Sequence, residues 1–453
     1  MKKTEKREKN FTVVNPRAAG IDIGSMEHYV AIMTEDGESV VKRYRTYTPD
    51  LESMAEYLQS NGITTVAMES TGNYWIPLFS ILESYGIEVN LVNARNLKNV
   101  SGRKTDVSDS QWIQKLHTFG LLRASFIPDE DTRKLRTYVR QRETIEKEKS
   151  RDLNQIGKVL SLMNIKLQNV VSDIEGVCSM KIIRDIASGV TEAKELSKHR
   201  DKKMKSSEEE IQLSLSGNYN SEHIFMLNQS LSSYDFHKNQ MEECDKEIEK
   251  ILSDLSSLNV KSEDNKKTKD SRKSKRKPRK NEYNFDINQY LKEIIKIDLT
   301  QVEGLQVKTI LTVISEIGTD MSKWKTSKHF VSWLRLCPNP QISGGKVLRN
   351  KSMQTSNRVS KAFRIAAQSL HSSQTALGSF YRRLSHRKGA AIAIKAVARK
   401  LAIILYEMLS KGKEYIKKSM EYYEDKYKEQ IIKNLNKKAE KYGFILQKVS
   451  AAS

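Results

Sequence analysis

Short runs of hydrophobic residues, each of strand length, dominate the first quarter of the chain. Four segments read as strands or a hairpin: AAGIDIGS at 18–25, a hairpin with a Glu-Asp-Gly turn at 28–47, TTVAMEST at 64–71 and EVNLVNAR at 88–95. Three helices are expected between and after them: 50–60, 75–85 and Thr105–Phe119. Strands that first follow one another and then alternate with helices predict an α/β domain with a mixed sheet.

The hydrophobic period becomes helical between Asp131 and Leu258. Two stripes repeat every three or four residues: Leu153, Ile156, Leu160 and Met163, then Ile248, Ile251, Leu255 and Leu258. Two such stripes separated by a less regular middle predict a long antiparallel helical hairpin or coiled coil. A plain helical bundle would produce the same pattern, so both arrangements remain possible from sequence.

Shifts in composition divide the rest of the chain. Prolines and glycines make the loop CPNPQISGGK incompatible with a helix, whereas the segments around it have short helical patterns. The Lys-rich stretch at 261–280 predicts a disordered linker, with an RNA-binding arm or a localisation-like tag as alternatives. The predicted organisation is a basic flexible arm at 1–19, an α/β domain at 20–128, the helical hairpin at 129–258, the linker at 259–285, an all-α domain at 286–410 and a charged helical tail at 411–453.

Charge is segregated by region. The chain carries 78 Lys and Arg against 56 Asp and Glu, a net charge of +22. Residues 20–128 contain 13 acidic and 9 basic side chains, whereas residues 321–406 contain 17 basic side chains and no acidic one. A folded segment of that length without carboxylates needs counter-charges from elsewhere, and phosphate is the expected source. This distribution predicts a nucleic-acid partner.

The cysteine and hydrophobicity patterns exclude several classes of protein. Cys178, Cys244 and Cys337 lie far apart, so neither a disulfide scaffold nor a zinc knuckle is expected. The chain has no stretch of about 20 uncharged apolar residues, and its basic start leads into no apolar signal segment. We therefore expect a soluble intracellular protein that does not span a membrane.

Four carboxylates stand out by their placement. Asp22 lies inside the apolar strand GIDIG, Glu69 ends the strand TTVAME, and Asp106 and Asp109 share one face at a helix start. An ionised carboxylate on a packed strand is costly unless it is paired or binds a metal ion. This layout is typical of RNase H-like nucleases, in which two Mg²⁺ ions assist phosphoryl transfer. Alternatively, the helix acids favour the helix dipole and Asp22 caps a turn.

A second candidate site is Ser343, which precedes Gly344 and Gly345 in the loop. Glycines allow close approach of a ligand to the backbone, and Lys346 and Arg349 could hold a phosphate beside the hydroxyl. An ordinary Gly-rich turn is the alternative.

Two further motifs have weaker implications. Tyr381 is expected to contact phosphate with its arginine neighbours, because no Arg–His–Arg constellation accompanies it. Residues 297–318 resemble a helix-hairpin-helix, a motif that presents backbone N–H groups to phosphate. Gln306 replaces its usual second glycine, so a structural turn is equally compatible.

Several longer motifs resemble one family. GIDIGSMEHYVAI, VAMESTGNYWIPLF and VNARNLKNVSGRKTDVSDSQWIQKLHTFGLLRASFIP are similar to the N-terminal domain of DEDD-type insertion-sequence transposases. These proteins are relatives of the Piv-type DNA invertases and are associated with a structured bridge RNA. IGTDMSKWKTSKHFVSWLRLCPNPQISGGKV and AAQSLHSSQTALGSFYRR extend the resemblance over most of the chain.

The resemblance implies an RNase H-like (RuvC-like) domain in which a tetrad binds Mg²⁺, with Mn²⁺ as an alternative: Asp22, Glu69, Asp106 and Asp109. It also implies that Ser343 attacks a DNA phosphodiester to form a phosphoserine intermediate. Many relatives have another serine before this one, whereas this chain has Ile342. Seven basic residues are predicted to contact nucleic acid: Arg103, Lys104, Lys346, Arg349, Arg358, Arg382 and Arg383.

The predicted function is recombination of double-stranded donor and target DNA for movement of an insertion sequence, guided by a noncoding bridge RNA. The resemblance also implies a bacterial cytoplasmic protein that is associated with the nucleoid when bound to DNA. Joining two DNA partners requires more than one active site, so we expect a dimer, and a tetramer on DNA. The helical hairpin and the tail are the expected subunit contacts. The alternatives are a Piv-like invertase or Holliday-junction-resolving nuclease, and a non-catalytic nucleic-acid-binding protein.

Overall fold

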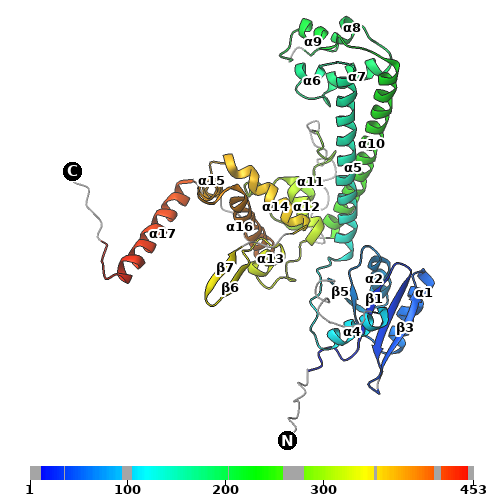
Figure 1. Ribbon diagram of the computed structural model, residues 1–453, viewed down its shortest axis with the longest axis vertical. Coiled ribbons are helices and arrows are strands. Elements are labelled where there is room, and N and C mark those ends of the chain that lie inside the picture. Colours follow the sequence, from blue (N-terminus) through cyan, green and yellow to red (C-terminus); the bar gives the residue numbers. More distant parts are fainter. Residues whose placement is uncertain are drawn as a thin grey trace. The chain divides into compact units, whose positions relative to one another are not determined.

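The computed structural model (Figure 1) divides into two compact units, one ending at Ile127 and the other beginning at Pro128. The residues that it describes are 12–34, 36–93, 105–201, 204–258, 280–350, 355–412 and 420–446. No helix in these ranges is long and apolar enough to cross a membrane.

A five-stranded mixed sheet forms the first unit, in the order β3-β2-β1-β4-β5. Strands β1 to β3 pair antiparallel, and β4 and β5 run parallel to β1. The elements are β1 Ala18–Ile23, β2 Glu27–Met33, β3 Ser39–Arg45, α1 Thr48–Ser60, β4 Thr65–Glu69, α2 Trp75–Ser84, β5 Glu88–Val92 and α4 Asp106–Thr118. The predicted mixed α/β architecture and its three helices are confirmed.

The two faces of this sheet are covered by different helices. Ile21 of β1 and Met68 of β4 belong to the core that includes buried residues of α1 and α2. Successive side chains of a strand point to opposite faces, so Gly20 and Ala67 face the other way. Ala67 packs against Ile113 of α4 on that side. Helix α4 therefore covers the face opposite to α1 and α2.

Gly20 lets α4 approach the sheet closely. A Cβ atom built at this position would lie 2.2 Å from the backbone N of Gln114 and 2.4 Å from the backbone O of Ser110. Neither backbone atom can move without displacing the helix, so a residue with a side chain does not fit here. The missing side chain thus sets the distance between β1 and α4.

Gly20→Ala is expected to destabilise the first unit by about 1–3 kcal/mol, the usual cost of overpacking a core. Thermal unfolding of the full chain would measure the loss as a lower melting temperature. Gly157→Ala in the second unit is the control, because its Cβ would only make an ordinary 3.7 Å contact with Ile174 Cδ1. Equal melting temperatures for Gly20→Ala and wild type would contradict the close approach.

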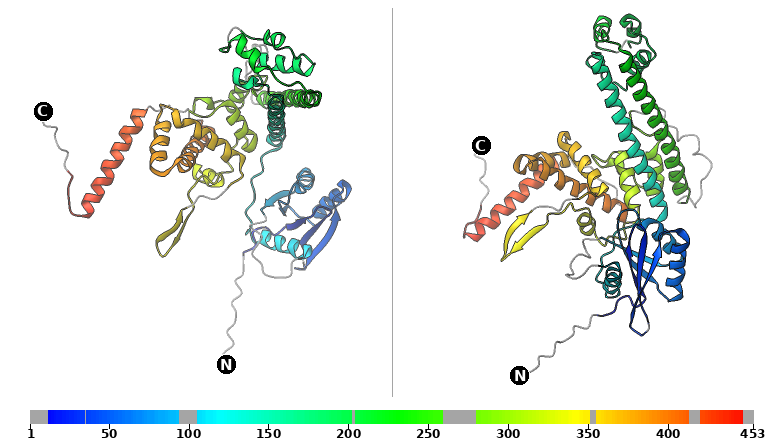
Figure 2. Two further views of the ribbon diagram at one scale, coloured as in Figure 1. Left: turned by 45° about the horizontal axis from the view of Figure 1, so that its top comes forward. Right: turned by 45° about the vertical axis from the view of Figure 1, so that its right-hand side comes forward.

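Two long helices, α5 (Glu130–Leu162) and α10 (Ser221–Leu258), form the hairpin of the second unit and lie side by side in Figures 1 and 2. Arg142 bonds Asp245, whereas His237 Nδ1 lies 2.6 Å from an oxygen of Asp152. Residue numbers therefore increase along α5 in the direction in which they decrease along α10. The two helices are antiparallel, as predicted. Four short helices connect the two at the far end: α6 Leu167–Val170, α7 Val177–Ala187, α8 Ala193–Ser197 and α9 Glu208–Ser214.

The buried stripe of α10 differs from the predicted one. Ile248 is fully buried as expected, but Leu252 is the next buried residue, and Ile251 and Leu255 are only half-buried. The side chain of Leu258 lies outside the described residues. The buried residues Met241, Asp245, Ile248 and Leu252 follow a spacing of three or four residues, so they define one face of α10 that includes a buried carboxylate and does not include Ile251.

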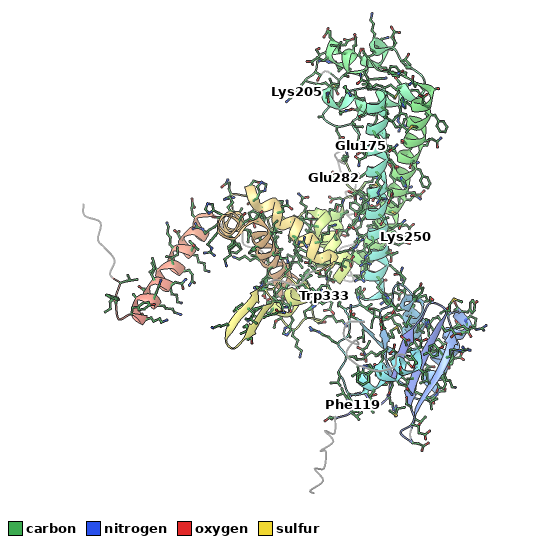
Figure 3. All side chains as sticks on the ribbon, in the orientation of Figure 1. Phe119, Glu175, Lys205, Lys250, Glu282 and Trp333 are labelled. Atoms are coloured by element: carbon green, nitrogen blue, oxygen red, sulfur yellow. The ribbon has the colours of Figure 1, made fainter. Side chains whose placement is uncertain are left out.

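Helices also dominate the later part of the second unit. They are α11 Ile287–Ile295, the 3₁₀ helix η1 Leu299–Gln301, α12 Val307–Ile317, α13 Ser327–Trp333, α14 Arg358–Ser369, the 3₁₀ helix η2 Leu370–Ser372, α15 Ala376–Lys388, α16 Ala390–Lys411 and α17 Met420–Lys441. Trp324, Phe330 and Trp333, the last labelled in Figure 3, form an aromatic cluster with Tyr406 of α16. The hydroxyl of Tyr406 donates to the backbone O of Trp324 over 2.7 Å.

The end of the predicted linker packs against the helical hairpin. Residues 259–279 lie outside the described residues, but Tyr283 and Phe285 are buried. The guanidinium carbon of Arg142 lies 3.7 Å from the ring centroid of Tyr283. Nearby, a polar cavity of about 510 Å³ has Glu175 and Glu282, both labelled in Figure 3, among its lining residues.

The predicted loop CPNPQISGGK is partly a β-hairpin. It contains strand β6 (Pro340–Ser343), which pairs antiparallel with β7 (Lys346–Asn350). The prolines and glycines do exclude a helix, as expected. The strands form because the Gly-Gly turn can reverse the chain between them, a possibility that the loop interpretation did not consider. Figure 2 shows this hairpin extending away from the neighbouring helices.

Candidate active site

Asp22 and Glu69 occupy equivalent places on two neighbouring parallel strands. Ile21 of β1 pairs with Met68 of β4, and the two acids are the residues that follow. Both acids are half-buried and, by the alternation of strand side chains, both lie on the face covered by α4. The sheet thus brings one carboxylate from each strand to the same end of the same face.

Helix α4 runs opposite to these strands. Thr65 is the first residue of β4, and its Oγ1 lies 3.0 Å from Nε2 of His117, which belongs to the last turn of α4. Burial lowers the pKa of His117, which keeps the ring neutral at this contact. Gly20, further along β1, meets the middle of the helix. The first turn, with Asp106 and Asp109, therefore lies toward the strand ends that carry the other two acids.

Thr105 fixes where α4 begins. Its side chain accepts from the backbone N–H of Ser108, and the Ser108 hydroxyl caps the backbone of Thr105 in return. This capping box starts the helix at Asp106 and puts Asp109 one turn later. The predicted N-cap is confirmed, and the two acids share a helix face as the sequence indicated.

The donor set of this region suits a hard divalent cation. All four acids supply carboxylate oxygens, the ligands that Mg²⁺ and Mn²⁺ prefer. Among the described residues, no group of three or more His, Cys, Asp or Glu side chains lies close enough together to hold a metal ion. A bound ion would have to draw the four side chains together.

Tyr29 and Glu27 also lie on this face and were missed by the sequence analysis. Tyr29 is the cross-strand partner of Asp22, and its hydroxyl donates to Glu27 over 3.3 Å. Glu27 in turn lies 3.4 Å from Arg43 of β3. The alternation along this strand contained the signal, because Glu27, Tyr29 and Ala31 are two residues apart, but the predicted hairpin began one residue after Glu27.

Ser343 lies at the tip of the β6–β7 hairpin, where it pairs with Lys346. Between them, Gly344 and Gly345 have φ values of 55° and 74°, the left-handed region that a two-residue hairpin turn of type I′ requires. Cβ atoms at either glycine would meet no atom within 4 Å, so there is open space beside both glycines. The described residues from Gln341 to Leu348 are all exposed. A large substrate can therefore reach the serine hydroxyl.

The other predicted nucleic-acid contacts lie in different surroundings. Lys346 is exposed beside Ser343, whereas Arg103, Lys104 and the side chain of Arg349 lie outside the described residues.

Arg382 donates to the backbone O of His371 over 3.1 Å and to the backbone O of Ser373. The guanidinium carbon of Arg383 is 4.1 Å from the ring centroid of Tyr427 in α17. Both side chains therefore make contacts within the protein, Arg382 with the segment before α15 and Arg383 with α17.

Arg358 belongs to a network of ionic groups between α5 and the later helices, and Glu316 is its buried member. Arg358 bonds Glu143 of α5, and its Nε lies 4.0 Å from Glu316 of α12. Arg140 donates to both oxygens of Glu316, over 2.8 and 2.7 Å, and Arg136 Nε lies 3.3 Å from the same carboxylate. Three guanidinium groups around one buried carboxylate anchor α12 and α14 to the base of the helical hairpin.

The two motifs with weaker implications lie in packed surroundings. A Cβ atom at Gly304 would be 2.7 Å from the backbone O of Ala366, and Val302 and Leu305 on either side are buried. The segment before α12 therefore serves as a structural turn against α14. Tyr381 is only 7% exposed, so its side chain has little surface for the expected phosphate contact or for attack on DNA.

Comparisons with known proteins agree with this organisation. Residues 19–165 match the family model DEDD_Tnp_IS110, described as a transposase. Residues 298–382 match the model described as the transposase IS116/IS110/IS902 family. The two segments together cover just over half of the chain, and they include the four acids and Ser343. No curated protein matches the chain.

The fold and these matches define a DNA transposase with a DEDD-type domain and a following helical region. The chain belongs to the IS110 family of transposases. Binding to DNA follows from that membership.

Proposed function

We propose that this transposase cleaves and rejoins DNA through a covalent intermediate on Ser343, and that its DEDD domain supplies a divalent-metal site. The observation that carries the proposal is the exposed Gly-Gly turn, which presents the Ser343 hydroxyl beside Lys346. It lies within residues 321–406, which contain 17 basic side chains and no acidic one. Such a stretch attracts a phosphate backbone and leaves no carboxylate to repel it.

In the proposed reaction, Ser343 Oγ forms a bond to the phosphorus of a DNA phosphodiester. The bond from phosphorus to one deoxyribose oxygen breaks, and that oxygen leaves as a hydroxyl after it takes up a proton. The serine releases its own proton to solvent, so protons balance. Attack on the phosphoserine by a deoxyribose hydroxyl of the other DNA partner then reverses the step and joins the strands.

Asp22, Glu69, Asp106 and Asp109 are the proposed ligands of Mg²⁺ or Mn²⁺. The bound ions would supply positive charge to the phosphate and lower the pKa of a coordinated oxygen. The support is that β1, β4 and the first turn of α4 bring these residues to one end of one sheet face. A serine hydroxyl is a weak nucleophile at neutral pH unless a base or a metal ion activates it.

Two further parts of the proposal concern partners. A noncoding bridge RNA is the proposed guide, and the basic residues of 321–406 offer charge for both RNA and DNA. A dimer, and a tetramer on DNA, would bring together the several serines that two DNA partners need. Helix α17 is a candidate subunit contact, because Ile431, Ile432 and Leu435 are exposed on it.

Peptide mapping of the covalent complex tests the proposal directly. A duplex of the DNA flanking the gene, where an insertion sequence has its ends, would be incubated with the protein, its co-purified RNA and Mg²⁺. Trypsin cleavage after Arg335 and Lys346 releases LCPNPQISGGK, in which Ser343 is the sole hydroxyl residue. We expect mass spectrometry to find the nucleotide on this peptide. Cleaved DNA without any adduct would instead favour a resolvase-like reaction with water.

A further inference from the structure

The two faces of the β6–β7 hairpin have different chemistry. Ile342 pairs with Val347, and the next pair toward the turn is Ser343 with Lys346. Successive pairs of an antiparallel ribbon point to opposite faces. One face therefore carries the hydroxyl and the ammonium group, and the other face carries aliphatic side chains.

A third aliphatic residue lies next to the apolar pair. The register shifts between Gln341 and Ile342, so Leu348 is the extra residue of a β-bulge. Exposed fractions are 62% for Ile342, 58% for Val347 and 71% for Leu348. Single exposed hydrophobic residues are common on proteins, but a group at the tip of a projecting hairpin indicates a surface that a partner covers.

The charge of the residues around the hairpin favours DNA as the partner that covers this apolar face. The hairpin lies within residues 321–406, where every charged side chain is basic. A second copy of this stretch would be repelled, whereas a DNA duplex would be attracted. A two-stranded ribbon also has the dimensions to enter a DNA groove, and aliphatic side chains can wedge between base steps and unstack them.

We propose that Ile342, Val347 and Leu348 form a wedge that unstacks the base pairs next to the phosphate attacked by Ser343. This inference rests on the proposed function of Ser343 and assigns positioning residues to it. A ribbon inserted between the scissile phosphate and its neighbouring bases has Ser343 and Lys346 on the phosphate side. The aliphatic residues are then on the side of the bases, where they replace the lost stacking.

If these residues act as a wedge, adduct formation on DNA whose base pairs are already open should depend on them less. Two duplexes would be compared, one fully paired and one with two mismatched base pairs beside the cleaved phosphate. The variant is Ile342→Thr with Val347→Thr, since threonine keeps the β-branched shape that strands favour and loses the apolar surface. Leu213→Thr is the control, because Leu213 is likewise exposed, at 74%, but lies on α9.

On paired DNA, the single-turnover rate of adduct formation by the double variant is expected to fall at least about tenfold. On mismatched DNA it is expected to stay within about twofold of wild type, because the duplex is already opened. A 2-aminopurine base beside the phosphate should gain fluorescence with wild type and Leu213→Thr, and not with the double variant.

Equal losses on both duplexes would overturn the wedge, because a merely structural or protein-binding role does not depend on base pairing. Full activity of the double variant on paired DNA would overturn it as well. If wild type formed no adduct on either duplex, the proposed function of Ser343 would fail. The fluorescence change would then still decide whether the apolar face unstacks DNA.

Discussion

Ser343→Ala is expected to abolish the protein–DNA adduct, with a loss of more than about a thousandfold in strand cleavage. Alanine removes the oxygen that would bond to phosphorus and changes nothing else in the turn, because Gly344 and Gly345 keep their backbone conformation. Affinity for DNA and RNA should remain within about twofold, since Lys346 and the other basic residues stay in place.

Denaturing electrophoresis of labelled DNA, with and without Mg²⁺, measures the adduct, and filter binding measures affinity. Ser372→Ala is the matched control, because Ser372 is also exposed and belongs to the same acid-free stretch. An adduct that persisted in Ser343→Ala would identify a different nucleophile. Tyr381 would then be the next residue to replace, although its burial argues against it.

Asp22→Asn is expected to lower Mg²⁺-dependent cleavage at least about a hundredfold while the fold is retained. Asparagine has the same size as aspartate, so the packing of α4 against β1 is preserved. It removes one negative charge from a group of four carboxylates that all lie toward one end of the sheet. Less repulsion among them should leave the melting temperature unchanged or raise it slightly.

Cleavage would be followed over a series of Mg²⁺ and Mn²⁺ concentrations, together with thermal unfolding. Glu56→Gln provides the control, since Glu56 is an exposed acid of α1, on the opposite face of the sheet. A fully active Asp22→Asn variant would refute the metal site. Loss of activity together with a large fall in melting temperature would indicate a structural role for Asp22 instead.

Local patterns predicted the elements of the first unit well because their signals lie close together in sequence. Strand period, Gly-containing turns and the N-cap at Thr105 each involve a few neighbouring residues. The candidate acids were recognised for the same reason, since each one follows or interrupts an apolar run. Their common face could not be derived so directly, because it depends on the pairing of Ile21 with Met68 and on the close approach of α4 to Gly20.

Contacts between distant residues account for the differences in the second unit. Arg358 was predicted to contact nucleic acid from its place in a basic stretch, but it bonds Glu143, which is 215 residues away in the sequence. Leu252 replaces Ile251 in the buried stripe because the face of α10 that is buried depends on how this helix packs against α5, which the pattern within one helix does not determine.

The sequence by itself determined the succession of strands and helices, the regional segregation of charge, and the residues with candidate chemistry. All of these depend on the identity of nearby residues. Only the tertiary structure decided that Asp22 and Glu69 share the α4 face, that Ser343 is at the exposed end of a β-hairpin, and that its apolar neighbours face the opposite way. These features depend on strand register and helix packing, which are set by the sum of many long-range contacts and by close approaches such as that at Gly20.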